Sequence, residues 1–412
     1  MKLYNELRTA DFISYKYFQK NYTILIFLTA ILAFSFVNIV FFTSFNKGLE
    51  ETVNRELRTY VLGDIIIEPE GGDEVTKGKV GEDIINNADE VVNKVRALPG
   101  IMGVSKRIGL RATIAKKGKL SIGRVIAVIP EEDYDVSLLE PTIFEGNSIG
   151  RYERDGILMG VESAGTPWSR TLTQGTGISV NVGDKLEVNL DDKFKKNYTL
   201  KGMFDTRYFE SDFFTFINEK EIPESLGLKN KATSIMVKVD DRSKLQIYKR
   251  DILNLNLHVK VSTWDEKAGF GQQVAKSLGA IQIVMFVAGI VIASVTIFIT
   301  IYVNILSRMK FIGIMRAIGI SRSAIILSYL IETFFYCIAG IVIGLGIVIA
   351  IIKYLTVKPL DLPLGLVTPV VTPQNIIFGS LSIIVASLVS AFIPTWQVTR
   401  KNIIYAIYRG EK

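Results

Sequence analysis

The sequence predicts a membrane protein with four transmembrane helices and an α/β plus β extracytoplasmic domain inserted between the first and second of them. Four stretches, each with at most one charged residue, contain the roughly 20 apolar residues that cross about 30 Å of hydrocarbon. About 230 residues of mixed composition separate the first stretch from the second. The 412 residues are 49% hydrophobic with a mean hydropathy of +0.30, which lies between soluble and fully embedded proteins.

The four stretches are expected to be helical because backbone groups in lipid must form hydrogen bonds within their own segment. The predicted segments are a cytoplasmic amphipathic helix at 1–21, transmembrane helices at 22–46, 277–306, 324–352 and 374–398, a cytoplasmic helix at 307–323, a short external loop at 353–373 and a cytoplasmic tail at 399–412. The first stretch is too long for a cleaved signal peptide and lacks a small-residue cleavage site.

Charge orients these helices. The amino-terminal segment, the 307–323 segment and the tail together hold twelve bases and three acids, whereas the large insertion holds 34 bases and 36 acids. Basic residues favour the cytoplasmic side of a membrane. Both termini and the 307–323 segment are therefore predicted to be cytoplasmic, with the large domain outside a cell (cytoplasmic or inner) membrane.

The large insertion is predicted to have two parts. Strand–helix–strand patterns at 61–115 and 232–262 indicate an α/β domain formed by 47–135 and 231–270. The residues between them, 136–230, have the turn-rich texture of a mainly β subdomain. Its stretch 204–218 holds six aromatic residues in fifteen, which are either core strands or an exposed patch for a lipid or protein partner.

Small residues and a proline mark the third and fourth spans. Gly340, Gly344 and Gly346 form a small-residue ridge that permits close helix packing, either within one chain or across a dimer. Pro394 has no backbone N–H and is predicted to kink or end the fourth helix just before the tail.

Glu332 is the single charged residue within the four spans. A carboxylate in the membrane is costly and often marks a functional site. The alternative is a structural glutamate near the interface that bonds to Ser328, Tyr336 or a partner helix. The sequence leaves both interpretations open.

The sequence offers no catalytic motif. It has one histidine, His258, and one cysteine, Cys337, so no His-based triad, multi-His metal site or internal disulfide can form within it. It has no G-x-x-x-x-G-K-[ST], H-E-x-x-H or G-x-S-x-G element, and the acidic cluster at 131–135 lacks the spacing of a calcium loop. We predict no metal and no cofactor, and we assign the net charge of +7 to a membrane surface rather than nucleic acid.

The segment 307–323 carries four bases and no acid between two spans. The candidate contacts are an apolar knob and two bases, namely Ile314, Met315, Ile318, Arg316 and Arg322. Gly313 and Gly319 permit close approach or a helix cap. The helix could dock on a soluble partner, or its charges could hold it on anionic lipid headgroups.

Two segments carry a specific resemblance to a known family. FIGIMRAIGISRSAI at 311–325 resembles the segment between the second and third spans of permeases in the MacB/FtsX/LolC-LolE superfamily of ABC transporters, and FIPTWQVTRKNIIYAIYRGE at 392–411 is similar to the family's ending. LPGIMGVSKRI and GMFDTRYFESDFFTFIN resemble the periplasmic domain of the lipoprotein-releasing LolC/LolE members. The chain departs from the family pattern at Phe311, where Glu is usual, and at Asn402-Ile403, where Asp-Pro is usual.

The resemblance implies a permease that works as a dimer with a second copy or a paralogue. It also implies two cytoplasmic ATPase subunits, which bind the ATP and receive a coupling helix. The implied coupling residues are Ile312, Gly313, Ile314, Met315, Arg316, Ala317, Gly319, Ser321 and Arg322. Members of this type VII group work by mechanotransmission, in which closure of the ATPase moves the external domain and acts on a lipophilic or lipid-anchored substrate such as a lipid or a lipoprotein.

The same superfamily offers an alternative function. An FtsX-like regulator would activate a cell-wall hydrolase through its outer domain without transport. A membrane-anchored receptor without an ATPase is disfavoured, because one span would suffice as an anchor. The sequence thus leaves transport and regulation as the two candidates.

Overall fold

The structure is a computed structural model that describes residues 22–70, 84–137, 139–165, 178–190, 192–267, 269–362 and 364–400. The chain divides into two compact units, each of which we describe by itself. The membrane unit comprises Met1–Gly48, Ala275–Pro359 and Thr368–Lys412, and the inserted unit comprises Leu49–Val274 and Leu360–Val367. The predicted helix at 1–21 and all but the first two residues of the predicted tail lie outside the described residues.

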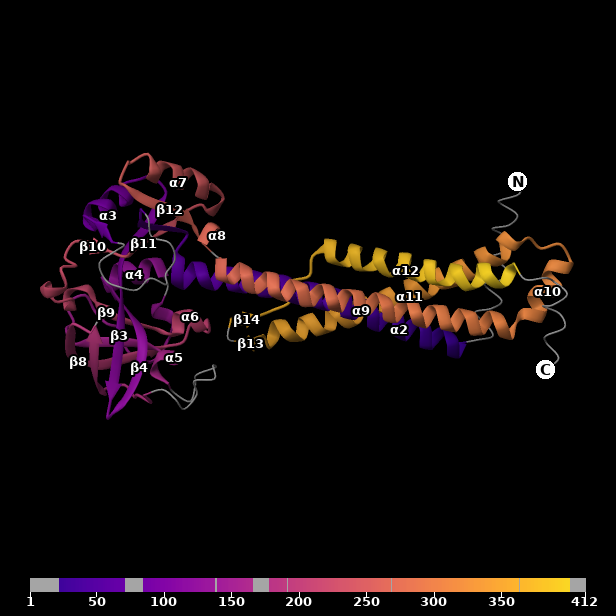
Figure 1. Ribbon diagram of the computed structural model, residues 1–412, viewed down its shortest axis with the longest axis horizontal. Helices are drawn as coiled ribbons and strands as arrows, with labels where there is room; N and C mark the ends of the chain where they lie inside the picture. The colour runs from indigo at the N-terminus through magenta and orange to yellow at the C-terminus, as the bar shows by residue number, and fades with distance from the viewer. Residues whose placement is uncertain are drawn as a thin grey trace. The chain divides into compact units, whose positions relative to one another are not determined.

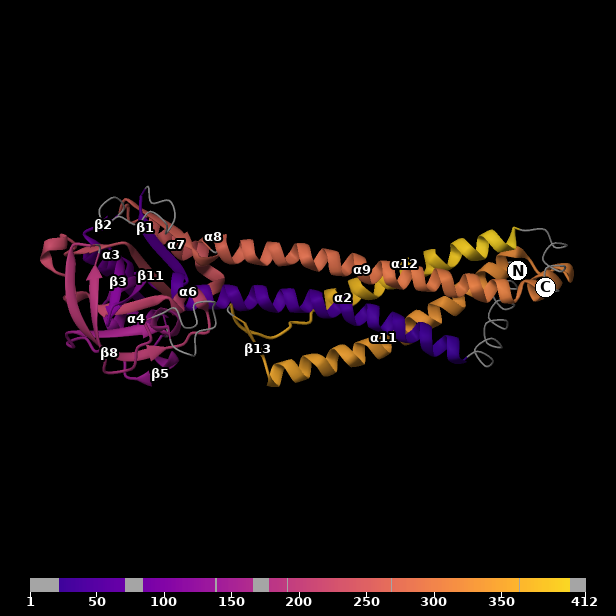
Figure 2. The ribbon, with the colours of Figure 1, turned by 60° about the horizontal axis from the view of Figure 1, so that its bottom comes forward.

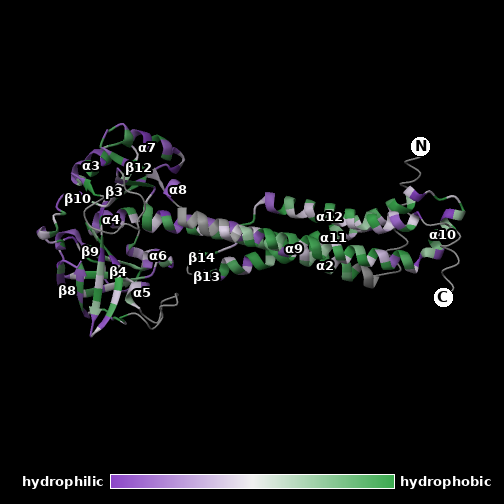
Figure 3. Ribbon diagram, viewed as in Figure 1, coloured by the Kyte–Doolittle hydropathy of each residue, from purple (hydrophilic) through white to green (hydrophobic). Residues whose placement is uncertain are grey.

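Four long helices cross the membrane unit (Figure 1). They are α2 (Tyr22–Glu56), α9 (Gly269–Ser307), α11 (Arg322–Val357) and α12 (Pro373–Thr399). Each is long and apolar enough to span a bilayer, and hydrophobic residues cover most of their length in Figure 3. The predicted fold class is confirmed, with four candidate transmembrane helices and a domain inserted between the first and second.

Two of these helices are longer than the predicted spans. Helix α2 continues to Glu56, where the prediction ended at 46, and a π-helical segment, Leu57–Leu62, follows it. Helix α9 begins at Gly269 rather than at 277. Hydropathy marks where a segment leaves the lipid, but helical hydrogen bonds can continue beyond that point. Composition therefore located the spans and not the helix ends.

Helix α2 is the central helix of the membrane unit. In the most apolar 18-residue stretch of α2, 44% of the residues are buried, whereas the corresponding share is 17% for α9 and 28% for each of α11 and α12. A glycine from every other long helix faces it, since Cβ atoms built at Gly289 and Gly379 would lie 3.3 Å and 3.1 Å from side-chain atoms of Ile39 and Val40. Gly340 on α11 makes a still closer approach at Leu32. The other helices keep large apolar surfaces that suit contact with lipid.

The inserted unit is built on a ten-stranded sheet. Its strands are β1 (Ile65–Pro69), β3 (Ile101–Lys116), β4 (Lys119–Val128), β5 (Ile143–Gly146), β6 (Gly156–Gly160), β7 (Lys185–Leu190), β8 (Phe194–Phe204), β9 (Phe214–Asn218), β11 (Ser234–Val239) and β12 (Val259–Thr263). The order is β12-β1-β11-β3-β4-β9-β6-β8-β5, and β7 pairs with both β3 and β8.

Strand β3 joins two layers of this unit. The first half of β3 pairs with β11, and the second half pairs with β7. Residues 107–116 of β3 also pair with β4. Because β7 also pairs with β8, the strands β3, β4, β9, β6, β8 and β7 close into a ring. The ring encloses an apolar core that includes Ile114, Val188 and Leu200. The predicted division at 136 does not coincide with this ring, which takes β3 and β4 from the predicted α/β part.

The α/β layer lies at the other end of the sheet (Figure 2). Helices α3 (Ala88–Arg96) and α7 (Leu245–Leu253) pack on β1, β11 and β12. Val95 and Ile252 from the helices and Ile67 from β1 are fully buried there. This is the helix-on-sheet packing that the apolar spacing in the two strand–helix–strand patterns predicted.

Short elements complete the described chain. They are α4 (Pro130–Ser137), α5 (Val161–Ala164), α6 (Phe209–Asp212), α8 (Trp264–Lys267), α10 (Met309–Ala317), the strand pairs β2 (Ile85–Asn86) with β10 (Lys231–Ala232) and β13 (Leu360–Leu362) with β14 (Gly365–Val367), and 3₁₀ turns at 140–142, 219–221, 224–226 and 242–244. The pair β13–β14 lies within the predicted external loop at 353–373, whose first five residues belong to α11.

The aromatic stretch at 204–218 forms core. Phe204, Tyr208, Phe214 and Phe216 are all at most 5% exposed. Phe204 and Phe216 meet edge to face, with ring centroids 5.6 Å apart. The core interpretation is confirmed, and the stretch does not form an exposed patch.

A buried ion pair fastens α4 to β3. Arg107 Nε and Nη2 donate to the two carboxylate oxygens of Asp133 at 2.7 and 2.9 Å. Ser105 and Ser137 also donate to this carboxylate. Asp133, one acid of the 131–135 cluster, is thus a structural residue. Its carboxylate oxygens accept hydrogen bonds from other groups inside the protein.

Replacing Asp133 with Ala is expected to destabilise the inserted unit by about 3–5 kcal/mol, because Arg107 would keep a buried charge without its counterion. Urea unfolding of the detergent-solubilised chain, followed by limited proteolysis, measures the change. Asp135→Ala is the control, since that side chain is exposed and should change stability by no more than about 0.5 kcal/mol. Equal effects of the two substitutions would contradict this role of the pair.

Candidate functional site

Helix α10 lies at the end of the membrane unit where α9 stops and α11 starts (Figures 1 and 2). One face packs into the unit, with Met309, Ile312 and Met315 in the apolar core. The opposite face exposes Phe311, Ile314 and Ile318 by 54%, 46% and 73%. Residues three and four apart share a helix face, so these three side chains form one exposed apolar strip.

The composition of this strip corrects the predicted knob. Met315 is only 8% exposed and does not belong to it, whereas Phe311 does. The α10 terminus explains the burial of Met315, because its carbonyl accepts from Ile320 N–H at 3.0 Å and Ile320 packs against the core. The sequence could have assigned Phe311 to this strip, because it lies three residues before Ile314 and therefore on the same face of the helix.

The carboxyl end of α10 is a Schellman motif. Gly319 has φ +97°, and its N–H donates to the Arg316 carbonyl at 3.2 Å. Only glycine adopts this left-handed conformation without strain. Ser321 Oγ then accepts from Ala324 N–H at 3.2 Å and caps the start of α11. These bonds fix a sharp turn between the two helices.

The bases in and directly after α10 differ in their surroundings. Arg316 Nη1 donates to the Thr399 carbonyl at 3.0 Å and thereby occupies a free acceptor at the end of α12. Desolvation, and then the nearby charge of Arg322, lower the pKa of Arg316, but an arginine stays protonated in a protein. Arg316 therefore has a partner within the chain, whereas Lys310 and Arg322 are exposed, as is Ala317. Gly313 is buried.

Glu332 is buried in α11, with an exposed fraction of 6%. Tyr336 Oη donates a hydrogen bond to Glu332 Oε1, one of the contacts considered from the sequence. Arg308 lies between the end of α9 and the start of α10 and is partly buried. Burial lowers the pKa of Arg308 itself, which remains a cation.

Two of the three glycines in α11 face α2. A Cβ at Gly340 would lie 2.7 Å from Leu32 Cβ, and one at Gly344 would lie 3.0 Å from the Ala33 carbonyl oxygen. No described atom lies within 4 Å of a Cβ at Gly346. The first two glycines therefore serve packing within the chain.

Pro394 does not end α12, which continues to Thr399. The hydroxyls of Thr395 and Thr399 donate to the carbonyls of Ala391 and Thr395 at 2.7 and 2.8 Å and satisfy polar groups in this last turn. Of the two predicted effects of Pro394, an end of the helix is excluded, because these bonds support the helix beyond it, and a kink stays a prediction.

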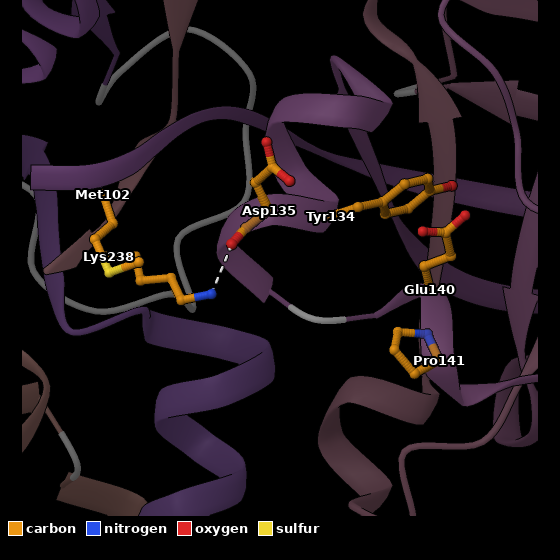
Figure 4. Close-up of a pocket in the computed structure, with 6 residues that line it drawn as sticks. All are labelled: Met102, Tyr134, Asp135, Glu140, Pro141 and Lys238. Atoms are coloured by element: carbon orange, nitrogen blue, oxygen red, sulfur yellow. Dashed lines mark hydrogen bonds between the residues drawn. The ribbon is translucent and has the colours of Figure 1, made fainter. Parts of the chain in front are cut away.

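The inserted unit contains a shallow cavity of about 400 Å³. Figure 4 shows its lining residues, Met102, Tyr134, Asp135, Glu140, Pro141 and Lys238. Lys238 Nζ donates to the Asp135 carbonyl at 2.8 Å across it. Among the described residues no group of His, Cys, Asp and Glu could hold a metal ion.

Comparison with known proteins finds a family match over the last third of the chain. Residues 283–403 match the family described as FtsX-like permease C-terminal. The lipoprotein-releasing system transmembrane protein LolC of Buchnera aphidicola subsp. Schizaphis graminum is 23% identical over 270 residues, covering 60% of this chain and 63% of the relative. This chain thus spans less than two thirds of the relative's length.

Two solved structures resemble the chain weakly. The periplasmic region of MacB from Actinobacillus actinomycetemcomitans matches at a TM-score of 0.39 and 12% identity, over 52% of this chain and 94% of that one. The extracellular domain of the ABC-type transporter YknZ from Gram-positive bacteria matches at 0.34 and 11%, over 48% and 97%. The fold of the inserted unit therefore rests on the strand pairing described above.

The four apolar helices and the match at 283–403 define a multi-pass membrane protein with an FtsX-like permease domain. The match at 283–403 and the likeness to LolC support the MacB/FtsX/LolC permease superfamily of ABC transporters, which the motifs also suggested. Members of this family are permease subunits and are typically not enzymes. The roles of the single residues in α10 and α11 stay predictions.

The glycine contacts yield a test of the packing. Gly340→Ala should destabilise the membrane unit by about 1–3 kcal/mol, because the added methyl group meets backbone atoms of α2 as well as Leu32. Gly346→Ala is the matched control and should leave the thermal unfolding midpoint in detergent unchanged or slightly raised. If both variants unfold at the same temperature, the close approach at Gly340 does not exist.

Proposed function

We propose that this chain is the permease subunit of an ABC transporter whose ATPase is a separate cytoplasmic protein. The observation that carries the proposal is the exposed apolar strip on α10, whose other face is anchored in the membrane unit. Exposed apolar side chains on a short, rigid helix suit a hydrophobic groove on a partner. The sequence has no phosphate-binding loop of its own, so the ATP would bind to the partner.

Charge complementarity supports the same partner. Lys310 precedes the strip in the chain, Arg322 follows it, and both are exposed. They suit acidic groups around a groove, where rim charges speed association more than they add affinity. Two ATPase subunits and two permease copies, identical or paralogous, would make the complex.

The substrate that fits this proposal is lipophilic or lipid-anchored. The name of the Buchnera relative, a lipoprotein-releasing protein, supports a lipid-anchored protein. In the proposed mechanism ATP-driven closure of the ATPase moves α10, and the membrane helices pass this motion to the inserted unit. Lipids or lipoproteins that co-purify with the complex would support transport, whereas a cell-wall hydrolase bound without them would support the regulatory alternative.

The substitutions Phe311→Ser and Ile318→Ser test whether the exposed apolar strip on α10 is a docking surface. Each should weaken binding of the ATPase about tenfold, the loss of roughly 1.4 kcal/mol at a buried apolar contact. Affinity capture of the detergent-solubilised chain with its ATPase, titrated in vitro, measures this. Lys310→Gln is the control, because it removes a charge and leaves the apolar side chains of the strip in place, so it should change the affinity less. If Lys310→Gln weakened association with anionic vesicles while both Ser variants still bound the ATPase, the helix would be a lipid-binding element instead.

The orientation of the chain is part of the proposal and has its own test. Leu120, on β4, and Lys310, on α10, are exposed, and the native Cys337 is buried. A membrane-impermeant maleimide applied to whole cells, or to spheroplasts where an outer membrane is present, should label Leu120→Cys and spare Lys310→Cys. Permeabilised cells should show both labelled. The opposite pattern in intact cells would reverse the topology and exclude α10 as a docking helix for a cytoplasmic ATPase.

A further inference from the structure

Arg316 is a base of α10 that does not belong to the exposed apolar strip. Its Nη1 donates to the Thr399 carbonyl at 3.0 Å, and Thr399 is the last residue of α12. Figures 1 and 2 both show α10 beside this end of α12. Carbonyls in the last turn of a helix need acceptor partners from outside it, and a cation at this end also complements the helix dipole. The guanidinium therefore suits the place where it lies.

Helix α10 is attached to two neighbouring helices. The turn at Gly319 joins it to α11, and the Arg316 bond joins it to α12. Met309 and Ile312 hold its inner face in the apolar core of the membrane unit. A displacement of α10 that keeps these contacts would therefore move the start of α11 and the end of α12 as well.

The other end of α12 is connected to the inserted unit. The segment Leu360–Val367 belongs to that unit, although it lies between α11 and α12 in the chain. Five residues, 368–372, separate this segment from the start of α12 at Pro373. Within them, the Val370 N–H donates to the Ser44 carbonyl of α2 at 2.9 Å. The connection is therefore short and hydrogen-bonded.

The hairpin of β13 and β14, which this segment forms, is anchored within the inserted unit. Leu364 forms an antiparallel bridge with Tyr208, a fully buried residue of the aromatic stretch. Thr52 Oγ1 donates to the Leu366 carbonyl at 3.4 Å. A Cβ at Gly365 would lie only 2.7 Å from Thr52 Cγ2, so the hairpin packs closely against this part of α2. Both Thr52 and Tyr208 belong to the inserted unit.

We propose that Arg316 is a positioning residue that ties α10 to α12, and that α12 passes a displacement of α10 to the hairpin β13–β14 of the inserted unit. This connection is separate from α2 and α9, the two helices that continue directly into the inserted unit. The charge of Arg316 is used within the chain and not on the partner. The inference rests on the proposed function, since the ATPase would supply the displacement.

The first experiment tests the tie without the ATPase. Spin labels at Lys310→Cys on α10 and Val389→Cys on α12, in a Cys337→Ala background, report the distance between the two helices in the full chain reconstituted in nanodiscs. Both labelled positions are exposed. Arg316→Gln should broaden the distance distribution, because α10 loses its bond to α12. Arg316→Lys keeps the charge and a donor group, so it should broaden the distribution less, and it also serves if Arg316→Gln does not fold.

Arg400→Gln is the matched control. Arg400 is an exposed arginine that follows Thr399, and its guanidinium lies 4.1 Å from the ring centroid of Trp396 on the same helix. The variant removes the same charge from the end of α12 but leaves the Arg316 bond, so the distribution should stay as in the unmodified chain. Broadening by both Arg→Gln variants, or by neither, would overturn the tie.

The second experiment uses the complex with the ATPase. A spin label at Leu360→Cys in β13, in the Cys337→Ala background, should change its spectrum when vanadate traps nucleotide on the ATPase, because the hairpin moves with α12. Arg316→Gln should retain the bound ATPase, since the exposed apolar strip is intact. It should reduce both the spectral change and the permease-dependent stimulation of ATP turnover about fivefold, the lower end of coupling between sites.

The outcomes separate this inference from the proposed function. Loss of ATPase binding in Arg316→Gln with unchanged label distances would make Arg316 a docking residue and overturn its positioning role. An unchanged response of the Leu360→Cys label in this variant would overturn transmission through α12. If the unmodified chain binds no ATPase, the proposed function fails and transmission fails with it, while the label distances still decide whether Arg316 ties the two helices.

Discussion

Close approach of three helices to α2 is the constraint on which the membrane unit depends. Lipid tails are as apolar as leucine, so packing rather than exclusion of water holds helices together in a bilayer. Gly289, Gly340 and Gly379, one from each of the other long helices, let the backbones approach α2. The ends of α9 and α11 are thereby fixed, and α10 lies between them. The exposed apolar strip on α10 is therefore positioned by contacts deep within the bundle.

The inserted unit depends in the same way on one strand. Strand β3 pairs with the α/β layer in its first half and belongs to the closed ring in its second half. The buried pair of Arg107 and Asp133 adds α4 to the same strand. Two cores that look separate in the sequence are therefore linked by continuous hydrogen bonding.

Local patterns predicted the spans, the inserted domain and the basic connector, because hydropathy and charge are properties of short segments. Contacts between distant residues were not predictable in this way. Arg316 bonds to Thr399, 83 residues away, and β3 pairs with β7 about 75 residues later. Met315 is buried because of the way the chain turns at the helix cap formed by Gly319. The glycine indicated a helix cap, but the direction in which the cap turns the chain could not be predicted from the sequence.

The closed ring of strands limits how other chains can add to the sheet. Each described strand within the ring has a neighbour on both sides, although residues 119–123, half of β4, lie outside its pairing with β9. The sheet ends at β5 and β12, which have four and five residues. Short terminal strands offer few unpaired backbone groups for a foreign strand. Proteins that meet this domain would therefore recognise it through side chains, which reduces its tendency to form edge-to-edge aggregates.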